Sequence, residues 1–189
     1  MKLPWRCLLL LSVAVRAAAQ VPSGGLATEW DILKTLSSLS EQTRRLRPAL
    51  EELRPADWVA QGAPATYTAQ SKSALAELGY LAGTVAELSR KPDRLTMTLE
   101  AFLRLQALET QLDSLSQGVR RYQNPALADL LQGMISENSA SREKLRQYLV
   151  DLAAAKEEEF RIADQEAQRC RASLIQQPRA PAKPFGKQQ

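Results

Sequence analysis

Residues 124–176 read NPALADLLQGMISENSASREKLRQYLVDLAAAKEEEFRIADQEAQRCRASLIQ, and this stretch decides the fold. Asn124 suits a helix cap and Pro125 the first helical position, because proline lacks an amide hydrogen that the helix could not use there. No further proline occurs before Pro178. Apolar side chains recur at helical spacing, at Leu127, Leu131, Met134, Leu145, Tyr148 or Leu149, and Leu152. The stretch predicts one very long helix, about 75 Å if unbroken.

Two parts of this stretch depart from the regular pattern. Between residues 133 and 141 the apolar spacing lapses and glycine, serine and asparagine collect, so we expect a kink or, alternatively, a break into two helices. Beyond Leu152 the spacing shifts by one residue, through Lys156 to Phe160, which relaxes the helical twist. The partner helices are shorter. The charge-rich final third is therefore expected either to project past them or to fold back on them.

A second helix is predicted from residue 28 to about residue 53. Its apolar positions follow a seven-residue repeat, typical of helices that pack side by side. The positions are Ile32, Leu36, Leu39, Thr43, Leu46, Leu50 and Leu53. The repeat keeps its phase across Pro48, which favours a kink over an end of the helix.

Two further helices are predicted, over residues 65–90 and 94–122. The expected core positions of the first are Ala74, Leu75, Leu78, Leu81, Ala82, Val85 and Leu88. Those of the second are Leu95, Leu99, Phe102, Leu105, Leu108, Leu112, Leu115, Val119 and Tyr122. Gly79 and Gly83 leave room for a neighbouring helix to approach closely, at some cost in helix propensity.

These elements together predict an all-α fold. Short turns at residues 91–93 and 123–124 make the helices they join antiparallel neighbours, and no stretch shows the alternation of a β-strand. We expect an antiparallel, coiled-coil-like bundle of about four helices, with a long C-terminal helix that is kinked and extends beyond it. Residues 54–66 form the only substantial predicted loop. Trp58 in this loop and Tyr67 at the start of the next helix either plug one end of the bundle or form an aromatic contact surface for a partner or a sugar.

The N-terminus has the order of a secretory signal peptide. Lys2 and Arg6 precede an apolar run at residues 7–15, and three alanines at residues 17–19 suit a cleavage site. The run is too short for a permanent anchor, which needs roughly 20 residues. Arg16 leaves the alternative that the segment stays attached. The predicted organisation is a signal peptide over 1–19, a flexible lead-in over 20–27, a helical domain over 28–177 and a disordered, proline-rich basic tail over 178–189.

This organisation explains the charge and cysteine content. The chain carries a net charge of +4, but the excess lies in the signal and in the tail, so nucleic acid is not an expected partner. Without the signal peptide, Cys170 is the only cysteine. It either lies buried as a small hydrophobe on a seam with Phe160, Ala163, Ala167 and Leu174, or pairs across chains or reacts as a free thiol.

Catalysis is not expected. The chain contains no histidine, which removes the usual base of nucleophilic triads and a frequent metal ligand. No phosphate-binding glycine loop is present, and no cofactor or metal is predicted. An enzyme built on carboxylates alone would need acids that converge in a pocket. The acids instead occupy positions expected to face solvent: Glu51, Glu52, Glu87, Glu100, Glu109, Glu143 and Asp151.

The leading hypothesis is a non-enzymatic exported protein that binds a protein partner or itself, through residues 152–176 in particular. The composition of the signal favours a bacterial envelope, periplasmic or secreted, with no transmembrane segment in the mature chain. A narrower version is a holdase-like chaperone, which needs an exposed apolar groove. The alternative is weak envelope contact, with Arg179, Lys183 and Lys187 on anionic lipid or cell-wall polymer and Phe185 inserted.

Overall fold

The computed structural model describes residues 29–176, which form five helices and no strand. The all-α prediction is therefore confirmed. The helices are α1 (Glu29–Glu51), α2 (Pro55–Ala60), α3 (Thr66–Leu88), α4 (Leu95–Tyr122) and α5 (Pro125–Gln176). The predicted signal peptide, the lead-in and the basic tail lie outside the described residues.

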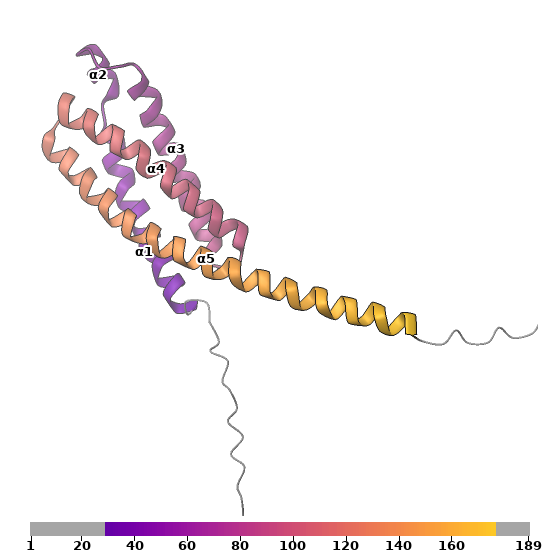
Figure 1. The fold of residues 1–189 in the computed structure, drawn as a ribbon. Coiled ribbons are helices and arrows are strands. Elements are labelled where there is room, and N and C mark those ends of the chain that lie inside the picture. The colour runs from indigo at the N-terminus through magenta and orange to yellow at the C-terminus, as the bar shows by residue number, and fades with distance from the viewer. Residues whose placement is uncertain (1–28, 177–189) are drawn as a thin grey trace, which may run out of the picture.

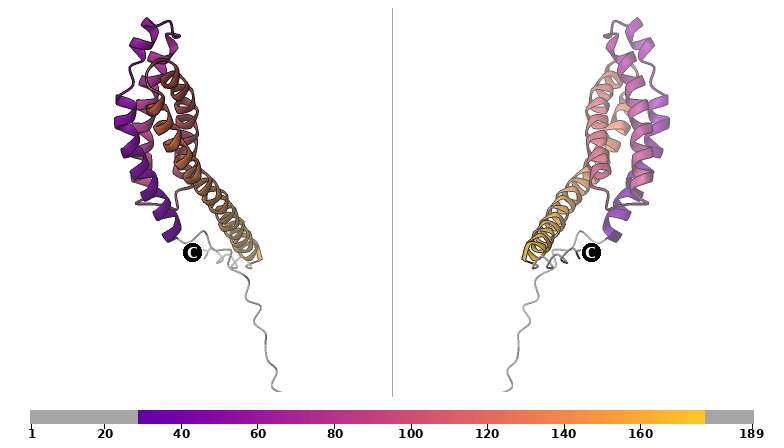
Figure 2. Two further views of the ribbon diagram at one scale, coloured as in Figure 1. Left: turned by 90° about the vertical axis from the view of Figure 1, so that its left-hand side faces the viewer. Right: turned by 90° about the vertical axis from the view of Figure 1, so that its right-hand side faces the viewer.

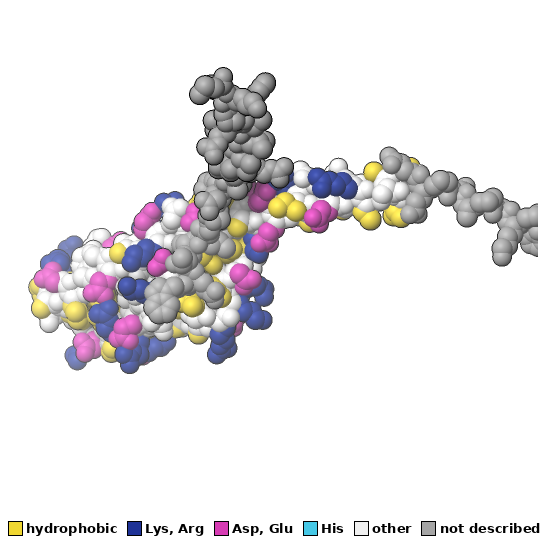
Figure 3. Space-filling view, turned by 90° about the horizontal axis from the view of Figure 1, so that it is seen from below, with side chains coloured by type: hydrophobic (Ala, Val, Ile, Leu, Met, Phe, Trp, Pro, Cys, Tyr) yellow, Lys and Arg dark blue, Asp and Glu magenta, His cyan; other side chains and the backbone are white. Residues whose placement is uncertain are grey.

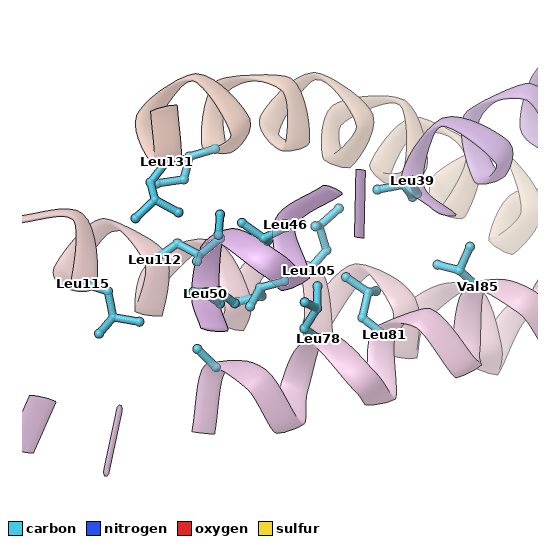
Figure 4. Packing of buried hydrophobic residues seen from close by; sticks show 14 of the residues in the cluster. Leu39, Leu46, Leu50, Leu78, Leu81, Val85, Leu105, Leu112, Leu115 and Leu131 are labelled. Atoms are coloured by element: carbon cyan, nitrogen blue, oxygen red, sulfur yellow. The ribbon is translucent and has the colours of Figure 1, made fainter. Parts of the chain in front are cut away.

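Four long helices share one core. α1 packs on α3 and α5, and α4 packs on the same two helices, while the short α2 sits at one end against α3 (Figures 1 and 2). Leucines from all four long helices point into the space between them (Figure 4). Each fully buried leucine stabilises the fold by about 1.5–3 kcal/mol, so this core is the main source of stability.

The seven-residue repeat predicted in α1 is the buried face of that helix. All seven positions are buried: six lie in α1, including the polar Thr43, and Leu53 lies just past the end of the helix. The hydroxyl of Thr43 donates to the carbonyl oxygen of Ser40, which satisfies it inside the core. Pro48 lies inside α1, and the helix continues to Glu51, as the unbroken phase of the repeat predicted.

The predicted loop at residues 54–66 contains a helix that sequence reasoning missed. Pro55 occupies the first turn of α2, and Gly62, just past its end, has a φ of 92°. That backbone conformation favours glycine. Proline at the start and glycine after the end are helix signals, but six residues are too few to show a helical period.

The core phase of α4 differs from the prediction at one position. Leu99 was expected inside, but its side chain is 44% exposed and Thr98 is buried in its place. Thr98 lies seven residues before Leu105, in phase with Leu112 and Val119. The seven-residue repeat therefore determines which side chain is buried here, although Leu99 is the more hydrophobic residue. Its hydroxyl donates to the carbonyl of Arg94, which lets threonine occupy a core site.

α5 runs without interruption, so the alternative of a break near residues 133–141 is not realised. The seam passes through this part on Ile135, Asn138 and Ser141, all buried, two of them polar. Leu152 is the last fully buried position, and every described side chain from residue 157 to residue 175 is exposed. We call residues 157–175 the arm. It projects from the other helices over about 28 Å (Figure 1).

We predict a large difference between two neighbouring leucines of α4. Leu105→Ala removes a completely buried side chain and should lower the free energy of unfolding by about 2–5 kcal/mol. Leu103→Ala, on the exposed face, is the control and should change it by no more than about 0.5 kcal/mol. Chemical denaturation measures both. Equal losses would show that the phase of α4 is wrong.

Candidate functional site

The residues singled out by sequence lie in two separate places. Trp58 and Tyr67 meet at the end of the fold that carries α2, whereas Phe160 and Cys170 lie on the arm. The two pairs do not form one site.

Trp58 closes the end of the core. Its indole is completely buried and meets the ring of Tyr67 edge to face, with 5.6 Å between ring centroids. The indole N–H donates to Gln123 Oε1 at 3.0 Å, and the same oxygen accepts the backbone N–H of Arg54. Gln123 Nε2 donates in turn to the carbonyl of Glu52. One glutamine therefore ties the ends of α1 and α4 to the buried tryptophan.

Gly118 makes room for the two rings. A Cβ atom at this position would lie 2.9 Å from a ring carbon of Trp58 and 3.0 Å from one of Tyr67. Because the indole is enclosed, it offers no exposed face to a partner. Sequence reasoning found the two aromatics but missed Gly118 and Gln123, whose roles depend on contacts distant in the chain.

We predict opposite effects for two glycine substitutions in helices. Gly118→Ala should lower the melting temperature although alanine favours helix, because its methyl group would collide with the rings. Gly133→Ala is the matched control. It meets open space and should stabilise the protein by up to about 1 kcal/mol. Thermal unfolding by circular dichroism compares them, and a stabilised Gly118→Ala protein would disprove the close packing.

The arm exposes its apolar stripe fully. Phe160 is 76% exposed, and Leu174 and Cys170 are also exposed. The interpretation of Cys170 as a buried hydrophobe is therefore wrong, because the seam on which it lies continues past the end of the core. Apolar side chains alternate with charged ones along the arm, and acidic groups lie nearer the body than the outer basic groups (Figure 3).

Charge pairs within the arm and at its start support its helix. Lys156 Nζ lies 2.9 Å from Glu159, and Arg161 pairs with Glu158, both three residues apart. The hydrogen bond from Arg161 lowers the pKa of Glu158 below its usual range. Such pairs stabilise an exposed helix only weakly, because solvent screens them. The arm thus has local support for helix without packing against the body.

Glu109 is the main departure from the expected distribution of acids. It was expected to face solvent but is buried where α4 meets α5. Its Oε2 atom lies 2.8 Å from Arg142 Nε, whose N–H is not aimed at it, while Oε1 has no hydrogen-bond partner. Burial raises the pKa of Glu109, and nearby Asp113 adds to this; the charge of Arg142 and a hydrogen bond from Ser139 oppose it. Glu109 follows Leu108 and lies three residues before Leu112, both completely buried, so it borders the core face of α4, but its charge favoured an exposed position.

We predict that Glu109→Gln stabilises the protein at pH 7. Folding raises the pKa of this carboxyl, so ionising it disfavours the folded state. Below the ordinary pKa the group is protonated in both the folded and the unfolded protein, and it costs no stability. The cost grows as the pH rises above that value and is complete above the pKa of the folded state. The gain in melting temperature over the original protein should shrink at pH 4. The same gain at both values, or a loss at pH 7, would contradict this.

Glu143→Gln is the control for that measurement. The hydrogen bond from Arg146 lowers the pKa of Glu143, so the sign is reversed. Its replacement should cost a little stability at pH 7 and nothing at low pH.

Residues 29–176 contain no group of three or more cysteines and acids placed to hold a metal ion. In that same part of the chain, no helix combines the length and the apolar character needed to cross a membrane. Comparisons with protein-family models, curated proteins and solved structures find no match to this chain.

Proposed function

We propose that this protein is a non-enzymatic, exported helical protein that acts by associating with itself through the arm of α5. The observation that carries the proposal is the stripe of Phe160, Ala163, Ala167, Cys170 and Leu174, which follows a seven-residue repeat on a helix exposed on every side. Such a repeat is the pattern of a helix that packs against another helix.

The energetics of an exposed helix support this proposal. Phe160 and Leu174 face water, so covering them would recover about 25 cal/mol for each Å² of apolar surface removed from water. Ala163, Ala167 and Cys170 are small, so a second helix can come close between the two larger anchors. The arm's own charge pairs reduce the ordering that association would require.

In this proposal α1, α3, α4 and the first part of α5 form an antiparallel four-helix bundle that holds the arm in place. The short turns between α3 and α4 and between α4 and α5 support it. A slight kink of α5 near residues 133–141 is also part of the proposal. Its support is the Ser136 hydroxyl, which donates to the carbonyl of Gln132 four residues earlier, a contact that often bends helices.

The site of action belongs to the same proposal. The basic start, apolar run and alanines of residues 1–19 support export, with the bacterial envelope as the favoured location.

We predict that the full chain forms dimers through the arm. Light scattering after size exclusion should give a mass that rises from one chain to two with concentration. Phe160→Glu should raise the dissociation constant by about thirtyfold, the effect of losing an aromatic anchor worth about 2 kcal/mol.

Ile162→Glu is the matched control, because Ile162 is an exposed apolar residue of the arm that lies off the stripe. It should dimerise like the original protein. A single-chain mass at every concentration, or equal weakening by both substitutions, would contradict the proposal.

A further inference from the structure

A continuous groove runs along the outer face of α3 and α4. Three shallow hollows of about 260 to 390 Å³ follow one another there, the first and second sharing Glu87 and Met97, the second and third sharing Glu100 and Arg104. We call this surface the α3–α4 groove. It begins at the turn between the two helices and extends to Ala107.

The groove carries exposed apolar groups, and the ring of Tyr80 among them lies under the guanidinium of Arg104, with 5.1 Å to the ring centroid. Tyr80 is 62% exposed and Leu103 is 53% exposed, with Leu99 beside it on α4. A Cβ atom on Gly83 would have nothing within 4 Å, and one on Gly79 would meet only the end of Arg47. The close approach that these glycines allow is therefore made by no helix of the described chain, although each costs α3 about 1 kcal/mol relative to alanine.

The two ends of the groove differ in charge. Arg90, Lys91 and Arg94 cluster at the turn with a single acid, Glu87, and none of the three cations forms an ion pair with another described residue. Further along, Glu77 and Glu100 share the single cation Arg104, leaving a net negative charge. The groove is thus basic at the turn and slightly acidic farther along.

The arm has the matching order of charges. Its first half carries five acids, Glu157–Glu159, Asp164 and Glu166, and one cation, Arg161, which pairs with Glu158, whereas its second half carries Arg169 and Arg171. The arm is also long enough to span the groove. It extends about 28 Å, and the α4 side of the groove, from Arg94 just before the helix to Ala107, extends about 20 Å, at 1.5 Å per residue. An arm laid from the turn toward Ala107 would put acids on the basic end and Phe160 beside Met97 and Gly83.

We propose that the α3–α4 groove of one copy receives the arm of a second copy. This inference rests on the self-association proposed above and names the surface that the arm covers. The arm of the same chain cannot fill the groove, because α5 is unbroken and carries its arm away from the body (Figure 1). Two arms paired side by side in parallel would place one acidic run against the other, whereas the groove offers each acidic run a basic partner.

Gly83→Leu tests the groove without disturbing the fold. A Cβ atom at this position has nothing within 4 Å in the single chain, so we expect thermal stability to be kept. It would fill the groove, and we expect the dissociation constant measured by light scattering on the full chain to rise at least tenfold. Gly133→Leu, equally open but on α5 outside the groove, is the matched control and should dimerise like the original protein.

A charge exchange tests the direction of the arm. Arg90→Glu with Arg94→Glu should weaken dimers at least tenfold, as should Glu157→Arg with Glu159→Arg. The four changes together should restore most of the affinity, because the opposite charges meet again. Absence of this rescue would overturn the proposed direction of docking.

The outcomes separate this inference from the proposed function. If Phe160→Glu dissolves the dimer but Gly83→Leu does not, the arm associates, two arms pair with each other, and the groove inference is overturned. A chain that stays monomeric overturns both. Loss of the dimer with Phe160→Glu and Gly83→Leu, but not with Ile162→Glu or Gly133→Leu, supports both.

Discussion

The continuity of α5 is the constraint on which the rest of the structure depends. One helix of 52 residues is longer than its 23- and 28-residue partners, so part of it must lie beyond them. Its buried seam stays in phase through Asn138 and Ser141, where a break would have let the last third turn back. The hydroxyl of Ser141 also donates to Gln42 of α1, which ties a polar position of the seam to a neighbouring helix. The unbroken course of α5, which places its first half in the core, therefore also leaves the arm exposed.

Polar groups fix how the helices sit on the apolar core. Leucines alone would tolerate a shift of one helix along another. Gln123 bonds to the indole of Trp58 and to the backbone at the end of α1, and Arg142 faces Glu109 across the α4–α5 contact. A buried carboxylate with one unpartnered oxygen contributes little net stability, but a shift of α5 would remove its only counter-charge. We interpret the pair as a device that specifies register.

Much of the helical layout follows from the sequence because periodicity and proline positions are local signals. The α1 repeat, the continuation through Pro48 and the start of α5 at Pro125 are of this kind. The wrong predictions concern side chains whose burial depends on the helices packed around them. Leu99 faces outward because Thr98 keeps the phase, Glu109 is buried by α5, and Cys170 is exposed because no other helix reaches the arm. The only sequence signal of the α3–α4 groove was the pair Gly79 and Gly83. Their spacing allows a neighbouring helix to approach α3 closely, but it does not show whether a helix of the same chain does so.

The central claim is that the arm is bare in the single chain and becomes covered when two chains meet. Hydrogen exchange followed by mass spectrometry at low and high protein concentration tests it most directly. At low concentration, amides of residues 157–175 should exchange much faster than those of residues 145–152, and they should become protected as concentration rises. Protection of the arm at every concentration would show that it folds back on its own chain. Rapid exchange at every concentration would show that nothing covers it, and either result would contradict the account.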